Sequence, residues 1–169
     1  MSFLDYILFG IYPYIAIAIF LLGSLIRFDR EQYTWKSDSS QLLKRGQLRW
    51  GSNLFHIGII GLMFGHAVGL LTPHEVYHAM GLSTELKQLI AMVAGGIMGS
   101  ICLAGVLLLV HRRLTEPRIL ATSTRMDIFI LLWILATLCL GLFSIIISSQ
   151  HMDGSVMLLL ADWAQHIVT

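Results

Sequence analysis

Four long apolar segments, separated by short polar ones, occupy most of the chain. Each is long enough to cross a bilayer as a helix, which takes about 20 residues. The segments cover approximately residues 4–27, 52–72, 87–111 and 126–149. We therefore predict an all-α fold, an integral membrane helical bundle with four transmembrane helices that forms a single domain over residues 1–169.

The first segment is expected to remain in the membrane as a helix and not to be a cleaved signal peptide. Its start carries Asp5 and no basic residue, and its apolar run exceeds a typical signal core. Pro13 interrupts the backbone hydrogen-bond ladder, which membrane helices tolerate when other groups satisfy the freed carbonyl. A kink near Pro13 is therefore expected.

Composition and charge agree with a membrane protein and orient it. Hydrophobic residues make up 56% of the chain and charged residues 12%, and the net charge of +1 argues against nucleic acid as a partner. All Lys and Arg residues except Lys87 lie in or next to segments 28–51 and 112–125. The positive-inside rule therefore predicts that both segments are cytoplasmic and that the N-terminus and the tail, residues 150–169, lie outside.

Two histidines lie within the second apolar segment, which carries no charged side chain. His56 and His66 are ten positions apart, so an ideal helix separates them by about 15 Å along its axis and about 80° around it. An imidazole in a bilayer needs a hydrogen-bond partner or a metal, and neutral imidazole is the usual axial ligand of a b-type haem. The spacing favours two stacked haem sites; the alternative is that both histidines hydrogen-bond to neighbouring helices or line a proton path.

Small residues at helical spacing predict where the helices pack closely. Gly58, Gly61, Gly65 and Gly69 form a stripe about 140° from the mean direction of the two histidines. A second row, Ala91, Gly95 and Gly99, is expected to be a packing seam of the third segment. The two cysteines, Cys102 and Cys139, are read as small apolar residues. The remaining histidines are expected to be interfacial or loop residues: His74, His78, His111, His151 and His166.

Seven short runs carry a resemblance that extends over nearly the whole chain. They are IYPYI (11–15), QYTW (32–35), SNLFHIGI (52–59), GH (65–66), LLTPH (70–74), HRRL (111–114) and QHMDGS (150–155). Together these runs resemble the gamma subunit of respiratory nitrate reductase, a di-haem cytochrome b of the bacterial inner membrane. The resemblance implies two haem b groups, with His56 a ligand of the haem nearer the cytoplasm and His66 a ligand of the haem nearer the outer face.

The resemblance also implies a reaction and partners. Quinol would be oxidised near the outer face, and electrons would pass through the two haems to a cytoplasmic iron-sulfur beta subunit and a molybdenum-containing alpha subunit that reduces nitrate. The loop 28–51, with Tyr33, Trp35 and charges of both signs, is a reasonable docking surface. Two other classes remain open: a cytochrome b of another respiratory or sulfur-metabolising complex, and a haem-free membrane anchor.

Charged residues at the segment ends gain roles from the resemblance. Gly65, His66 and Lys87 match the family's quinol pocket, where an ammonium would stabilise negative charge on a quinol oxygen. Without the family, Lys87 also fits a snorkelling lysine at a helix end. Arg112 and Arg113 could pair with haem propionates, or they could simply set the topology.

The C-terminus departs from the family pattern. The family continues past the run DWAQHIVT (162–169) into a fifth helix that carries the second axial histidine of each haem. No residue of this sequence matches those positions. We therefore expect the sequence to be an incomplete copy of a five-helix subunit.

Overall fold

The computed structural model describes residues 2–34, 42–150 and 152–168. Every regular element in these residues is helical. The chain divides into two compact units, one built on the N-terminal helices and the other on residues 39–166. Each unit is described by itself. Trp35, His151 and the C-terminal Thr169, which entered the sequence predictions, lie outside the described residues.

The first unit is a nearly continuous helix that changes its winding ahead of a proline. Helix α1 (Phe3–Asp5) is followed by the π-helix η1 (Tyr6–Ile11), α2 (Tyr12–Arg30) and the short 3₁₀ turn η2 (Gln32–Thr34). Pro13 lies in the first turn of α2. A proline ring cannot donate a hydrogen bond and crowds the preceding turn, and a widened π turn accommodates both effects. The expected disturbance near Pro13 thus takes the form of a π-helix.

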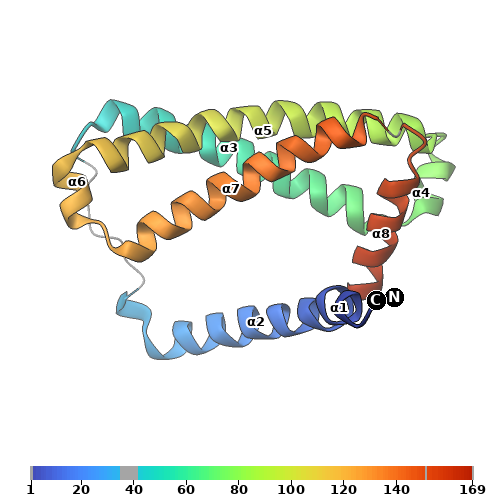
Figure 1. Ribbon diagram of the computed structural model, residues 1–169, viewed down its shortest axis with the longest axis horizontal. Helices are drawn as coiled ribbons and strands as arrows, with labels where there is room; N and C mark the ends of the chain where they lie inside the picture. Colours follow the sequence, from blue (N-terminus) through green and yellow to red (C-terminus); the bar gives the residue numbers. More distant parts are fainter. Residues whose placement is uncertain (1, 35–41, 151, 169) are drawn as a thin grey trace. The chain divides into compact units, whose positions relative to one another are not determined.

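The second unit contains three long helices and three short ones. The long helices are α3 (Arg45–Leu71), α5 (Thr84–Thr115) and α7 (Arg125–Ser148). The short helices are α4 (His74–Ala79), α6 (Pro117–Thr122) and α8 (Ser155–Val168). Helix α5 packs against both α3 and α7, more extensively against α3 (Figure 1).

Four helices in the described residues are long and apolar enough to cross a membrane. They are Phe3–Arg30, Arg45–Leu71, Thr84–Thr115 and Arg125–Ser148. Each predicted span lies on one of them, and α3 and α5 extend several residues into the polar sequence at their ends. This extension follows from local capping and packing, because a helix continues past the apolar run until its backbone groups find other partners.

The contact between α3 and α5 depends on small residues, but not on the whole predicted stripe. A Cβ added at Gly58 would lie 2.5 Å from the Cβ of Cys102, and one at Gly61 would lie 2.8 Å from the sulfur of Met98. A Cβ at Gly65 or Gly69 would meet nothing within 4 Å. The close approach therefore involves only the first half of the stripe, and the two helices leave open space around its second half.

The predicted seam of α5 faces α7. A Cβ at Gly99 would lie 2.6 Å from a methyl carbon of Leu142, and one at Gly95 would lie 3.9 Å from Ile145. Cys102, which is fully buried, lies between these contacts and the contacts with α3. Small residues on two faces of α5 thus let α3 and α7 pack against the same helix.

Candidate functional site

The two histidines of α3 share one hydrogen-bond geometry. His66 Nδ1 lies 2.7 Å from the carbonyl oxygen of Leu62, and His56 Nδ1 lies 2.7 Å from that of Ser52. A carbonyl oxygen only accepts, so Nδ1 carries the proton in both rings. When such a ring is neutral, its Nε2 atom keeps a lone pair. This tautomer, held by a backbone carbonyl, allows a histidine to ligate a metal through Nε2.

His66 lies on the wall of a mainly apolar cavity. The cavity has a volume of about 470 Å³ and is bounded mainly by α3, α5 and α7. No Lys, Arg, Asp or Glu lines it. Its polar groups are His66, Gln88 and the hydroxyls of Thr137, Ser144 and Ser148. His56 is not among its lining residues.

The cavity is suited to a flat, mostly apolar cofactor. Its volume falls within the range of about 300–1,000 Å³ that is typical of ligand sites. Gly95 and Gly99 of the α5 seam form part of its floor, so backbone can approach a ring closely there. One imidazole with a free Nε2 enters from α3. The donor set therefore fits a haem at His66, while His56 offers the ligand geometry without a described cavity around it.

Lys87 is buried at the end of the unit where α3 ends and α5 begins. Its side chain belongs to a residue that is only 7% exposed, and its Nζ lies 3.8 Å from the centre of the Tyr77 ring. The Tyr77 hydroxyl donates a hydrogen bond of 2.6 Å to the carbonyl of Val68, two residues after His66. Asp162 of α8 supplies an attractive charge to Lys87. Tyr77 thus connects the helix of His66 with Lys87.

Two glutamines hold the same end of the unit together. The Gln165 amide of α8 donates to the carbonyl of Leu70 at 2.9 Å and to that of Thr72 at 3.1 Å, which satisfies two acceptors at the end of α3. The Gln88 amide donates to the carbonyl of Ser148 at 3.0 Å and to its hydroxyl at 3.1 Å. Gln165 thus joins α8 to α3, and Gln88, which lines the cavity, joins α5 to α7.

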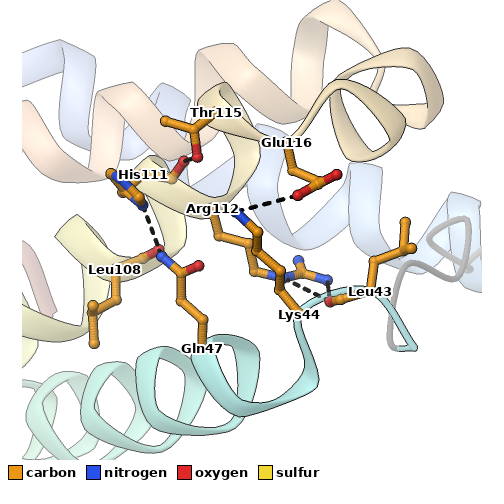
Figure 2. Close-up of polar contacts among 8 residues, drawn as sticks. All are labelled: Leu43, Lys44, Gln47, Leu108, His111, Arg112, Thr115 and Glu116. Carbon is orange, nitrogen blue, oxygen red and sulfur yellow. Dashed lines mark hydrogen bonds and ion pairs between the residues drawn. The ribbon is translucent and has the colours of Figure 1, made fainter.

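Arg112 lies at the opposite end of α5, in a group of polar contacts that Figure 2 shows. Its guanidinium donates to the carbonyl of Leu43 from Nη2 at 2.8 Å and from Nε at 3.3 Å, and the residue is 3% exposed. Lys44 pairs with Glu116 at 3.2 Å. The Gln47 amide lies 2.9 Å from His111 Nδ1 and donates to the carbonyl of Leu108 at 3.2 Å.

Arg113 contacts α7. Its guanidinium lies 3.6 Å from the carboxylate of Asp127, which also accepts from the backbone N–H of Thr124 in the capping box of α7. Both residues line a second cavity of about 220 Å³ with Arg112 and apolar residues of α3, α5 and α7. Two hydrogen bonds of the Arg112 guanidinium thus go to the turn before α3 and the ion pair of Arg113 goes to α7, although both residues line this cavity.

Several residues of these contacts were not singled out from the sequence. Gln88 and Gln165 each join helices that are far apart in the chain, whereas Tyr77 joins the consecutive helices α3 and α4. Amide side chains next to apolar runs are a weak signal for buried hydrogen bonds, which could have pointed to Gln88 and Gln165. Nothing in the local sequence around Tyr77 indicates that its ring covers Lys87.

Comparison with known proteins decides the family. The model of the nitrate reductase gamma subunit family matches residues 5–169. The chain belongs to this family. It is 53% identical to the respiratory nitrate reductase 1 gamma chain of Escherichia coli (strain K12) over 169 residues, which cover all of this chain and 75% of the relative. It is 34% identical to the nitrate reductase gamma chain of Bacillus subtilis (strain 168) over 162 residues, 96% of this chain and 73% of the relative.

Membership of the nitrate reductase gamma subunit family accounts for the apolar helices. The family supplies the membrane subunit of respiratory nitrate reductase, an oxidoreductase complex. A second E. coli relative, the respiratory nitrate reductase 2 gamma chain, is 51% identical and is also covered over 74% of its length. The family resemblance inferred from the seven sequence runs is thereby confirmed.

Proposed function

We propose that this chain oxidises quinol in the membrane and passes the electrons through two b-type haems to an iron-sulfur subunit for nitrate reduction. The observation that carries the proposal is the free Nε2 of His66, which belongs to a ring on the wall of an apolar cavity of about 470 Å³. His66 would hold the haem in that cavity through Nε2, and His56 would hold the second haem in the same way. When bound, the haems supply one-electron transfer.

The protein's contribution begins with the hydrogen bonds to Leu62 and Ser52. By holding Nδ1, the two carbonyls orient each imidazole and increase its basicity as a ligand. On an ideal helix the ten-residue separation keeps the two ligands about 15 Å apart along the axis, a distance suited to two cofactors in series.

Quinol would bind near the C-terminal end of α3, beside Gly65 and His66 of that helix and Lys87 of α5. Gly65 leaves open space beside His66, because a Cβ there would meet nothing within 4 Å. The buried ammonium of Lys87 would stabilise the negative charge that develops on a quinol oxygen as its proton leaves. Oxidation of one quinol releases two protons and two electrons, and the protons would leave on the Lys87 side of the membrane.

The remaining polar residues support a sidedness. We propose that the end carrying Arg112 and Lys44 faces the cytoplasm, with the N-terminus outside, in a bacterial inner membrane. There the iron-sulfur beta subunit would dock, and the molybdenum-containing alpha subunit would reduce nitrate. Two arginines are proposed to pair with haem propionates. Arg113 can turn toward a propionate more easily than Arg112, because its contact with Asp127 is a long ion pair of 3.6 Å. Arg112 is held by the Leu43 carbonyl.

Haem content in histidine variants tests the proposal. We would measure dithionite-reduced minus oxidised spectra of membranes carrying the parent protein with its partner subunits, His66→Ala, His56→Ala, and His166→Ala as a control on α8. Each of the first two should lose one b-type haem, and His66→Ala should also lose quinol-dependent nitrate reduction. Full haem content in either variant would contradict the assignment, and absence of haem in the parent would favour a haem-free anchor.

A further inference from the structure

A pair of histidines on α4 forms a site that the proposed function does not use. His74 and His78 are four positions apart, so they lie on the same face of the helix, one turn apart. Their rings are arranged edge to face, with a centroid distance of 4.4 Å and an interplanar angle of 81°. We propose that His74 and His78 bind one late first-row divalent cation, of which Zn²⁺ is the best-suited example.

The ring separation is close to that of two imidazoles on one metal ion. A Zn–N bond is about 2.1 Å and the ring centre lies about 1 Å behind the nitrogen, so two imidazoles on a tetrahedral zinc ion have centroids about 5 Å apart. The 4.4 Å separation therefore needs only a small side-chain adjustment. Imidazole is a ligand that suits zinc, copper and nickel, whereas calcium and magnesium require oxygen.

His74 carries a nitrogen that lacks a partner. Its Nδ1 is shielded from solvent and has no hydrogen bond within the described residues. A buried polar atom without a partner costs about 1–3 kcal/mol. His78, by contrast, is exposed, so a cation can reach the pair from solution. A metal bridging the two rings would use the lone pair of one nitrogen on each and fix both side chains.

The letters of this turn, His-Glu-Val-Tyr-His at residues 74–78, also match the H-E-x-x-H pattern of zinc hydrolases. That chemistry needs a third protein ligand and a substrate cleft. No group of three His, Cys, Asp or Glu side chains that could hold a metal occurs in the described residues. The site is therefore a binding site with two protein ligands, in which water completes the coordination, and hydrolysis is not part of the proposal.

Zinc titration of matched variants tests the site independently of haem and quinol. The protein, purified from membranes with the subunits that accompany it, would be titrated with Zn²⁺ alone in competition with a chromogenic chelator. His74→Ala and His78→Ala would be compared with the parent, with Glu75→Gln and His166→Ala as controls. His78→Cys would test rescue, because a thiolate also binds zinc.

The parent should bind one equivalent of Zn²⁺ at this site. In each of the two alanine variants, the affinity of the site for Zn²⁺ should be at least tenfold lower. Both controls and His78→Cys should retain that equivalent. Unchanged zinc affinity in either alanine variant would overturn the proposal, because a site with two ligands needs both. Parallel haem spectra separate this outcome from the proposed function, since neither His74 nor His78 is assigned to a haem.

Discussion

The ammonium nitrogen of Lys87 lies 3.8 Å above the ring of Tyr77, whose hydroxyl is bonded to the carbonyl of Val68. The Tyr77 side chain therefore contacts both the Lys87 ammonium of α5 and the C-terminal part of α3, the helix that carries His66. The ring face favours a cation, and this attraction is stronger where water is excluded. At the proposed quinol site, Tyr77 would be a positioning residue for Lys87 and would act on quinol only through the ammonium.

Replacement of Tyr77 should separate its two contacts. Tyr77→Leu removes the ring face, and a cation–π contact worth about 1 kcal/mol corresponds to roughly a fivefold rise in the KM for quinol, with a smaller change in kcat. Tyr77→Phe keeps the ring and loses only the hydroxyl bond, so its KM should stay nearer the parent value. Steady-state quinol oxidation with nitrate as acceptor gives both constants. Equal KM values in Tyr77→Leu and the parent would show that the ring does not position Lys87 for substrate.

The contact between α3 and α5 should not accept a methyl group at Gly58. A Cβ at this position would lie 2.5 Å from Cys102 on α5, and neither backbone can move away without disturbing the other contacts between α3 and α5. Gly58→Ala should therefore lower the free energy of unfolding by about 1–3 kcal/mol. Gly141→Ala on α7 is the control, because a Cβ there meets nothing within 4 Å. Thermal unfolding in detergent compares the two, and equal midpoints would contradict the packing.

Gln165 should anchor α8 to the end of α3. Gln165→Glu keeps the size of the side chain but removes the amide donors that reach Leu70 and Thr72. Two part-buried carbonyls then lose their partner, at a cost of about 1–3 kcal/mol. The expected result is faster proteolysis within α8 in folded protein. Gln150→Glu, at an exposed position before α8, serves as the control, and equal cleavage rates in the two variants would argue against the anchor.

Lysine should not replace Arg112 in the last turn of α5 without a loss of stability. Its planar guanidinium donates twice to the carbonyl of Leu43 in a nearly fully buried position, a geometry that one ammonium cannot reproduce. Arg112→Lys should therefore lower the free energy of unfolding by about 1–3 kcal/mol. Arg118→Lys, an exposed residue of α6, should leave it unchanged. Chemical unfolding monitored by tryptophan fluorescence measures both; a parental midpoint for Arg112→Lys would refute the argument.

Part of the histidine site could be predicted from the local sequence of α3. The positions of His56 and His66 on one membrane helix followed from the apolar run and the helical repeat. Their shared tautomer depends only on carbonyls four residues earlier on the same helix. The assignment of these residues to haems, and of Gly65 and Lys87 to quinol, stays a prediction. What the sequence could not indicate is that the wall opposite His66 is built from the α5 seam and α7.

The glycine stripe illustrates the limit in the packing. All four glycines follow the helical repeat at intervals of three or four residues, yet only Gly58 and Gly61 meet α5 closely. Helical periodicity defines a face but not the crossing point of two helices, which depends on the side chains of both partners. Likewise, the adjacent arginines 112 and 113 were predicted as a pair, and they contact different segments because successive residues of a helix point about 100° apart.

The sequence by itself determined the helical membrane class, the four apolar segments, the histidine register on α3 and the family. These properties are local, because a bilayer requires about 20 apolar residues per span and leaves backbone groups no partner outside a helix or a closed barrel. Only the tertiary structure decided that Tyr77 covers Lys87, that Gln165 caps α3 and that His66 faces a cavity. The contact of Gln165 and the walls of the cavity join residues distant in the chain, the contact of Tyr77 with Lys87 joins two successive helices, and their geometry exists only once the helices have packed.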